Sequence, residues 1–218
     1  MKSFTDNQVD AEKFTKQILI VGLGGIGSNL LDLVMPVISK SLQPLEIHLM
    51  DDDLVDRSNL AHQRFTESDI GLSKAETLVA RLPKSDIVRL IPRFEKLTEP
   101  SQLAGYDLII VAVDNEAPRK LVHQSGILWA DLRCQGDGWI IIDNETDISS
   151  IAKLPAQIKP TSCQLPGAIE SGNIEFGFAA VAAIGAQWMC QKLRILRGEN
   201  TRAPGFTMGY LTHGQMKI

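Results

Sequence analysis

The sequence has little excess charge and lacks both a basic block and a long apolar run. Its 218 residues include 22 Lys and Arg against 26 Asp and Glu, which gives a formal net charge of -4. The sequence contains no cluster of Lys and Arg that could bind the phosphates of a nucleic acid. The longest apolar run, 178–184, is far shorter than the ~20 residues that span a bilayer, and residues 1–6 carry no apolar signal core. We therefore expect a cytoplasmic protein that binds neither nucleic acid nor a membrane.

Cysteine is also scarce, with three residues far apart in the chain. An odd number at such spacing predicts neither a disulfide framework nor a zinc site of four thiolates. Cys134 ends an expected strand and Cys190 lies in an Ala-rich helical segment, so we predict that both are small core residues. Cys163 differs, because it lies in a segment from about 143 to 172 that has little periodicity and is interrupted by proline. A segment of that kind in a compact domain is usually functional or mobile.

The length and composition are those of an ordinary globular domain. Hydrophobic residues make up 44% of the chain and charged residues 22%, and 218 residues suffice for one domain with a full core. Residues 1–16 are polar with scattered apolar side chains. We therefore expect an N-terminal arm over 1–16 and a single domain over 17–218.

A glycine-rich turn follows the first apolar run. The run 18–21 breaks into the sequence GLGGIG, after which apolar residues recur with a helical period. Glycines at such a turn permit unusual backbone conformations and let phosphate oxygens approach the amides of a helix N-terminus. Gly22, Gly24, Gly25 and Gly27 are thus predicted to form a nucleotide cradle, the alternative being a tight turn that binds nothing.

Strands and helices alternate through the rest of the chain. After a helix that begins at the glycine turn, strands are predicted over 46–50, 88–91, 106–113, 127–133, 139–142 and 206–211, and helices over 73–82, 115–125 and 173–194. The first strands should pair in parallel through right-handed crossovers, whereas Gly136-Asp137-Gly138 predicts a hairpin. Asn173 is expected to cap the last helix. The fold class is therefore α/β, a mixed sheet with a parallel core, antiparallel strands at one edge and helices on its faces.

Charged residues stand where ligands bind in such sheets, beyond the carboxyl ends of the strands. Asp51 and Asp53 follow the strand 46–50, and Asp114 follows the strand 106–113. The alternatives are a solvated turn for the first two and a helix cap for Asp114. Arg119, one turn into the following helix, can pair with Glu116.

Lys74 has an unusual place in a helix. Ser73 and Glu76 have the spacing of a capping box, so Lys74 falls in the first turn of the predicted helix 73–82. A lysine is disfavoured at the positive end of the helix dipole, and a nearby anion would remove the conflict. Lys74 is therefore predicted to bind an anion rather than to be an ordinary surface charge.

These elements occur in one order at compatible spacing. After the glycine loop come Asp51 and Asp53, Ser58-Asn59-Leu60, Gln63, Gly71-x-Ser73-Lys74-Ala75 and Asp114-Asn115-x-x-x-Arg119. Together they resemble the ThiF/MoeB/ubiquitin-activating (E1-like) superfamily of adenylating enzymes, over roughly residues 17–194. The glycine loop alone is a weak signal, but the combination is specific.

The resemblance implies a dimeric, Rossmann-like adenylation domain that binds ATP and Mg²⁺. Such a domain would join AMP to the C-terminal glycine of a ubiquitin-like or sulfur-carrier protein and release pyrophosphate, before a downstream conjugating or sulfur-transfer partner acts. A carboxylate that attacks the α-phosphate needs the triphosphate charge neutralised, and glycine amides, Lys74 and a metal held by Asp114 suit that task. By the same resemblance, Asp51 or Asp53 would hold the ribose hydroxyls, Asn59 would support the phosphates, and Gln63 would belong to the nucleotide site.

The chain departs from the family pattern at three points. His62 stands where members usually have Arg before the Gln, and Arg64 is expected to take the role of that arginine. Members often supply an Arg from an N-terminal segment of the partner subunit, but Arg57 is the first arginine here. The usual Cys-x-x-Cys ligand pairs are missing, so no zinc is expected.

Cys163 is the candidate nucleophile of the resemblance. Members that pass the activated carboxyl to sulfur carry a cysteine in the crossover loop before the last long helix, and Cys163 has a comparable place. An incidental loop thiol is the alternative. Two other functions also stay open, a catalytically degenerate scaffold subunit and an NAD-dependent oxidoreductase in which Asp51 binds the adenosine ribose.

Overall fold

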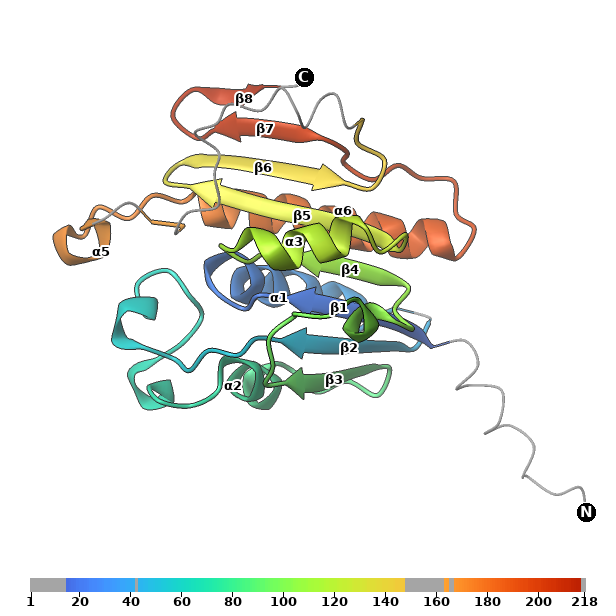
Figure 1. Ribbon diagram of the computed structural model, residues 1–218, viewed down its shortest axis with the longest axis horizontal. Coiled ribbons are helices and arrows are strands. Elements are labelled where there is room, and N and C mark those ends of the chain that lie inside the picture. Colours follow the sequence, from blue (N-terminus) through green and yellow to red (C-terminus); the bar gives the residue numbers. More distant parts are fainter. Residues whose placement is uncertain (1–14, 42, 148–162, 165–166, 217–218) are drawn as a thin grey trace, which may run out of the picture.

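The computed structural model of the chain describes residues 15–41, 43–147, 163–164 and 167–216, with no side chains described after 213. Its eight described strands form one sheet in the order β3-β2-β1-β4-β5-β6-β7-β8 (Figure 1). The strands are β1 Lys16–Val21, β2 Leu45–Met50, β3 Val88–Arg93, β4 Leu108–Val111, β5 Leu128–Gln135, β6 Gly138–Asp143, β7 Thr207–Tyr210 and β8 Gly214–Met216. The α-helices are α1 Gly25–Ile38, α2 Lys74–Arg81, α3 Glu116–His123, α5 Ala168–Ser171 and α6 Gly177–Leu196, and the 3-10 helices are η2 Arg57–Asn59, η3 Glu67–Asp69 and η4 Pro100–Leu103.

The sheet changes direction after β5, as the sequence predicted. Strand β1 pairs in parallel with β2 and β4, β2 with β3, and β4 with β5. The pairs β5–β6, β6–β7 and β7–β8 are antiparallel. The tight turn between Gln135 and Gly138 accounts for the change, because a connection of two residues can join only antiparallel neighbours. Gly136 takes φ +60° in this turn.

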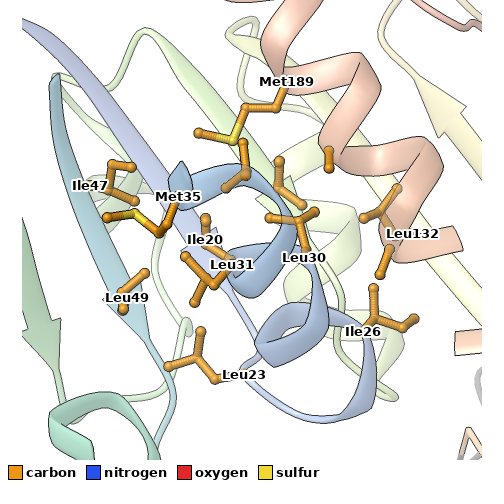
Figure 2. Packing of buried hydrophobic residues seen from close by; sticks show 14 of the residues in the cluster. Ile20, Leu23, Ile26, Leu30, Leu31, Met35, Ile47, Leu49, Leu132 and Met189 are labelled. Carbon is orange, nitrogen blue, oxygen red and sulfur yellow. The ribbon is translucent and has the colours of Figure 1, made fainter. Parts of the chain in front are cut away.

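Alternate residues of the central strands feed two separate cores. In β1, Ile18 and Ile20 face α1 and α6, whereas Leu19 and Val21 join the core under η4 and α3. Figure 2 shows the first core, where side chains from α1 pack against β2, β5 and α6. The central strands are buried on both faces, which explains their continuous apolar sequences.

Two sheet elements differ from the sequence prediction. Strand β4 spans Leu108–Val111, shorter than the predicted 106–113, because Ala112 and Val113 extend beyond its pairing with β1. Strand β8 was not predicted, and it extends the antiparallel edge by pairing with β7.

The predicted helix cap at Asn173 is wrong. Helix α6 begins at Gly177 after Phe176, and the backbone N–H of Asn173 donates instead to the carbonyl of Ala168 at 2.9 Å, at the end of α5. The N–H of Gly177 donates to the carbonyl of Gly136 at 3.0 Å. The β5–β6 turn therefore fixes where α6 starts.

Part of the predicted arm belongs to the sheet. Lys16 begins β1, and its ammonium lies 2.8 Å from Asp107 Oδ1, while the arm residues 1–14 lie outside the described residues. So does most of the predicted segment 143–172, namely 148–162 and 165–166. Among the described helices, none has the length and apolar character to cross a bilayer.

Candidate active site

A pocket of about 730 Å³ opens beyond the carboxyl ends of β1, β2 and β4. Figure 1 shows the segment between β2 and α2 and the short helix α5 on that side of the sheet, past the arrowheads of the parallel strands. Residues from all these elements line the pocket. They include the predicted residues Gly22, Gly24, Gly25, Asp51, Asp53, Asn59, Gln63, Lys74, Asp114 and Cys163.

The glycine turn is shaped by two close backbone approaches. Gly22 has φ +90°, and a Cβ at this position would lie 2.7 Å from the carbonyl oxygen of Ala112. A Cβ on Gly27 would lie 2.0 Å from the carbonyl oxygen of Gly22. Glycine at both positions lets the chain fold tightly from β1 into α1, whose first residues Gly25 and Ile26 line the pocket. The geometry therefore fits a cradle for an anion at the helix N-terminus.

Asp51 supports this turn from the end of β2. One carboxylate oxygen accepts the N–H of Leu23 at 2.6 Å, and the other accepts the N–H of Asp53 at 2.9 Å. Burial raises the pKa of Asp51, and the charge of Lys74 and these two hydrogen bonds oppose that rise. Asp51 thus links the glycine loop to the backbone at Asp53.

Lys74 lies in the first turn of α2, as predicted, behind the cap Ser73, whose hydroxyl accepts the N–H of Glu76 at 3.3 Å. Its side chain is 6% exposed, and its ammonium donates to Asp53 Oδ2 at 2.8 Å. The Asp53 side chain is 65% exposed. The lysine is therefore held at the pocket wall by a carboxylate that faces solvent, and an anionic ligand can compete for it.

Three side chains of the loop after β2 border the glycine turn. Asn59 ends η2 and accepts the N–H of Asp56 at 2.9 Å. Gln63 lies 3.8 Å from a Cβ built on Gly24, and a Cβ on Gly25 would lie 2.9 Å from the His62 ring. Gln63 Oε1 and His62 Nδ1 are buried without a hydrogen-bond partner among the described residues. These orphaned polar atoms beside the cradle fit a site that receives a polar ligand.

Arg64 does not reach the pocket position of His62, where we expected it to take the role of the family arginine. His62 lines the pocket, and burial, then the charge of Lys74, lower its pKa, so its ring is neutral near pH 7. The structure does not bring Arg64 to the pocket lining. Its guanidinium Nε lies 3.1 Å from Asp32 Oδ2 on α1, with the side chain 55% exposed.

Asp114 lines the opposite wall, where the chain leaves β4. The residue is exposed, and the helix cap falls instead to Asn115, which accepts the N–H of Ala117 at 3.0 Å. The capping alternative for Asp114 is therefore wrong. Asp114, just after β4, and Lys74, in the first turn of α2, therefore line the same pocket from different elements.

A buried charge cluster under this wall was missed in the sequence. Asp131 of β5 is fully buried and pairs with Arg119, Arg133 and His123. Arg119 therefore does not pair with Glu116, and it also donates to the carbonyl of Val113. Burial, then repulsion from Arg133, lowers the pKa of Arg119 to about 9. The available signal in the sequence was Asp131, which stands between the apolar residues Ala130 and Leu132 in the predicted strand 127–133.

We expect the cluster to make the stability of the protein sensitive to acid. Burial, then the charges of Arg133 and Arg119, lower the pKa of His123 to about 4, against 6.5 for a free imidazole. Between these pH values the unfolded chain binds a proton at His123 and the folded chain does not. The free energy of unfolding should therefore fall as the pH drops from about 6.5 to about 4. Since one pKa unit corresponds to about 1.4 kcal/mol, we expect His123 to account for at most about 3 kcal/mol of this loss.

Urea unfolding across that pH range tests this prediction with His123→Gln, which can still donate to Asp131. We expect the variant to lose less stability on acidification than the native chain. His213→Gln, at an exposed position before β8, is the control and keeps the native acid-side slope. Equal slopes for the native chain and His123→Gln would contradict the assignment.

Cys163 lies at the N-terminus of α1. The N–H of Ile26 donates to its sulfur, and its Cβ would lie 3.7 Å from a Cβ on Gly25. The sequence shows no cation near Cys163, yet the structure brings Arg119 to it. Cys134 packs against the first core, as predicted, but it also lines the pocket, where its thiol hydrogen-bonds Cys163. Cys190 is half-buried against the α1 and α6 core, as predicted.

A glycine turn at the end of a parallel strand, with charged side chains from α2 and from the ends of β2 and β4 around it, defines a Rossmann-like α/β domain. The model of the ThiF family matches residues 4–214. The chain belongs to the ThiF family.

Several curated relatives are named as activating enzymes or adenylyltransferases. The Nedd8-activating enzyme E1 catalytic subunit of Drosophila melanogaster is 33% identical over 146 residues, which cover 63% of this chain and 29% of that protein. A probable adenylyltransferase/sulfurtransferase, MoeZ, of Mycobacterium tuberculosis is 27% identical over 195 residues, which cover 82% of this chain and 48% of that protein. The chain thus spans less than half the length of these relatives.

Solved structures agree on the fold. E. coli MccB with ATP has a TM-score of 0.62 at 15% identity, covering 91% of this chain and 61% of that one. PaaA has a TM-score of 0.62 at 18% identity, covering 92% of this chain and 62% of that one. At these identities the likeness establishes the Rossmann-like fold and its mixed sheet.

Proposed function

We propose that the chain catalyses ATP-dependent adenylation of the C-terminal glycine of a ubiquitin-like or sulfur-carrier protein. One observation carries this proposal. The glycine cradle, the Lys74–Asp53 pair, Asp114 and Cys163 come from distant parts of the sequence and line a single pocket. Membership of the ThiF family and the names of the relatives support it.

Different pocket residues would bind different parts of ATP. The amides at the start of α1, behind the glycine turn, and the ammonium of Lys74 face the triphosphate, where Asn59 and Gln63 add polar contacts. Asp51 or Asp53 accepts the ribose hydroxyls. With these groups in place, the carboxylate of the carrier can approach the α-phosphate without meeting its full negative charge.

Asp114 is the residue that would hold Mg²⁺. Its exposed carboxylate at the pocket wall is a hard oxygen ligand of the kind that Mg²⁺ prefers, and such sites keep water and substrate phosphates as further ligands. The ion would supply charge neutralisation on the leaving pyrophosphate. Asp51, Asp52 and Asp53 also bring ligand atoms within 4.8 Å of one another, but Lys74 already pairs with Asp53.

Cys163 would accept the activated carboxyl as a thioester. Its place at a helix N-terminus, near Arg119, is the environment of a reactive rather than an incidental thiol. A homodimer, a cytoplasmic location and a downstream conjugating or sulfur-transfer partner are proposed with it. The exposed side chains of Leu33 and Val37 on α1 are compatible with a subunit contact. No described residue pair offers the usual zinc ligands of the family.

One observation favours a second function, a subunit that binds nucleotide without catalysis. A neutral His62 occupies the pocket position where the family has Arg, and Arg64 pairs with Asp32 instead. Carrier-dependent release of pyrophosphate from ATP would remove this alternative.

The first test is thermal unfolding of the native chain with ATP and Mg²⁺, and separately with NAD. A ligand at 100 times its dissociation constant adds about 2.7 kcal/mol, which for a chain of this length raises the midpoint by roughly 5–10 °C. We expect that rise with ATP and none with NAD. A rise with NAD alone would refute the proposal in favour of an oxidoreductase, and no rise with either would refute ATP binding.

A further inference from the structure

Two cysteines from different parts of the chain meet in the pocket. Cys134 is the penultimate residue of β5, and Cys163 lies before α5. A hydrogen bond joins their side chains. Both line the same pocket as the glycine loop. The sequence gives no sign of this contact, because neither residue lies in a cysteine motif.

The backbone around the pair holds this contact in place. Gly136, two residues after Cys134, donates its N–H to the carbonyl of Cys163 at 3.3 Å. Gln164 is buried, donates through its amide to the carbonyl of Glu175 at 2.8 Å and accepts the N–H of the same residue at 3.1 Å. The loop that carries Cys163 is therefore tied to the β5–β6 turn and to the segment before α6.

The surroundings of the two sulfurs differ. Cys163 receives the N–H of Ile26 in the first turn of α1, whereas Cys134 has no such helix donor among its interactions. The hydrogen bond from Cys134 lowers the pKa of Cys163, aided by Arg119 and Ile26 against the effect of burial. The same bond and burial raise the pKa of Cys134. The surroundings therefore favour the thiolate form at Cys163 over Cys134.

We propose that Cys134 is a positioning residue whose S–H donates to the sulfur of Cys163 and keeps that sulfur ready to attack the activated carboxyl. The inference rests on the proposed function of Cys163. In the step it serves, the Cys163 thiolate forms a bond to the carbonyl carbon of the carrier adenylate, and the bond from that carbon to the AMP oxygen breaks. AMP leaves with the electron pair. No proton has to move, because Cys134 keeps its own.

The test compares Cys134→Ala, which removes the donor, with Cys134→Ser, which keeps a hydroxyl donor. Each full-length chain is treated with iodoacetamide in reducing buffer over a range of pH, and mass spectrometry follows the alkylation of the Cys163 peptide. We expect the midpoint of the native profile to lie below that of an ordinary thiol, near pH 8.5. It should shift upward by about one pH unit in Cys134→Ala and stay near native in Cys134→Ser.

Cys190→Ala, in α6 away from the pocket lining, is the matched control and leaves the Cys163 midpoint unchanged. A thermal midpoint for each variant confirms that the chain is folded. Equal Cys163 profiles in the native chain and in Cys134→Ala would overturn the proposal, as would Cys134→Ser behaving like Cys134→Ala.

This readout needs neither ATP nor a carrier, so its failure is distinct from that of the proposed function. ATP stabilisation together with an unshifted profile refutes the role of Cys134 alone. A shifted profile in a chain that ATP does not stabilise establishes the thiol pairing and refutes the adenylate step that it was proposed to serve.

Discussion

Lys74→Met should weaken the affinity for ATP by about 100-fold. Removing one partner from a desolvated charge contact costs about 2–5 kcal/mol, and each 1.4 kcal/mol is a factor of ten. Lys74 is the buried lysine of the pocket, and a nucleotide can recruit it because its partner Asp53 is exposed and can turn to solvent. Arg119 and Arg133 also line the pocket, but Asp131 holds both, and the lining residue Lys96 is exposed and lies 3.7 Å from Asp52. The variant also leaves Asp53 unneutralised beside the triphosphate.

Calorimetric titration with a non-hydrolysable ATP analogue and Mg²⁺ measures this loss. Methionine keeps an unbranched apolar side chain at this buried position, so the fold should survive, and the unfolding midpoint without nucleotide verifies it. Lys84→Met is the matched control, because Lys84 is exposed, lies outside the pocket lining and donates to the carbonyl of Val79 at 2.8 Å. Native affinity in Lys74→Met would mean that Lys74 serves only to hold Asp53.

The local sequence was sufficient for most of the fold. The apolar runs of β1 and β2, the glycine turn and the cap at Ser73 are each specified by neighbours in the chain, and the structure has them where the sequence placed them. The start of α6 was not predictable in this way. Gly177 is fixed by the carbonyl of Gly136, a contact between distant residues that leaves no periodic signal.

The residues of the candidate site also differ in whether the local sequence predicts their place. Asp51, Lys74 and Asp114 could be predicted because each follows a strand or opens a helix on the ligand-binding side of the sheet. Their places in one pocket agree with that prediction, while their roles stay to be tested. Arg64 shows the limit, since sequence adjacency to Gln63 says nothing of which way its side chain turns, and Asp32 captures it.

The cysteines show the same limit more sharply. The strand position of Cys134 predicts its packing against the core, but it does not reveal that the thiol also lines the pocket and contacts Cys163. Its partner comes from a loop whose path depends on the hydrogen bonds of Gly136 and Gln164. The charge that surrounds Cys163 likewise comes from α3, through Arg119. Reactivity at this sulfur is thus a property of the assembled fold.

Gly27→Ala should destabilise the fold by about 3 kcal/mol or more and abolish ATP binding. Overpacking a well-filled site usually costs about 1–3 kcal/mol when side chains can yield. Here the added Cβ would lie 2.0 Å from the carbonyl oxygen and 3.0 Å from the carbonyl carbon of Gly22, which are backbone atoms. That turn has no room to retreat, because a Cβ on Gly22 would already lie 2.7 Å from the Ala112 carbonyl on its other side.

Gly24→Ala is the matched control within the same loop. The nearest atom to its Cβ is Gln63 Nε2 at 3.8 Å, an ordinary contact with the end of a flexible side chain. We expect its unfolding free energy in urea to change by less than about 1 kcal/mol. Because both variants add one methyl group to the GLGGIG turn, the difference between them isolates the backbone clash at Gly27. If Gly27→Ala unfolded at the native urea midpoint and still bound ATP, β1 and α1 would have to be joined by a looser turn, and the anion cradle would lose its structural basis.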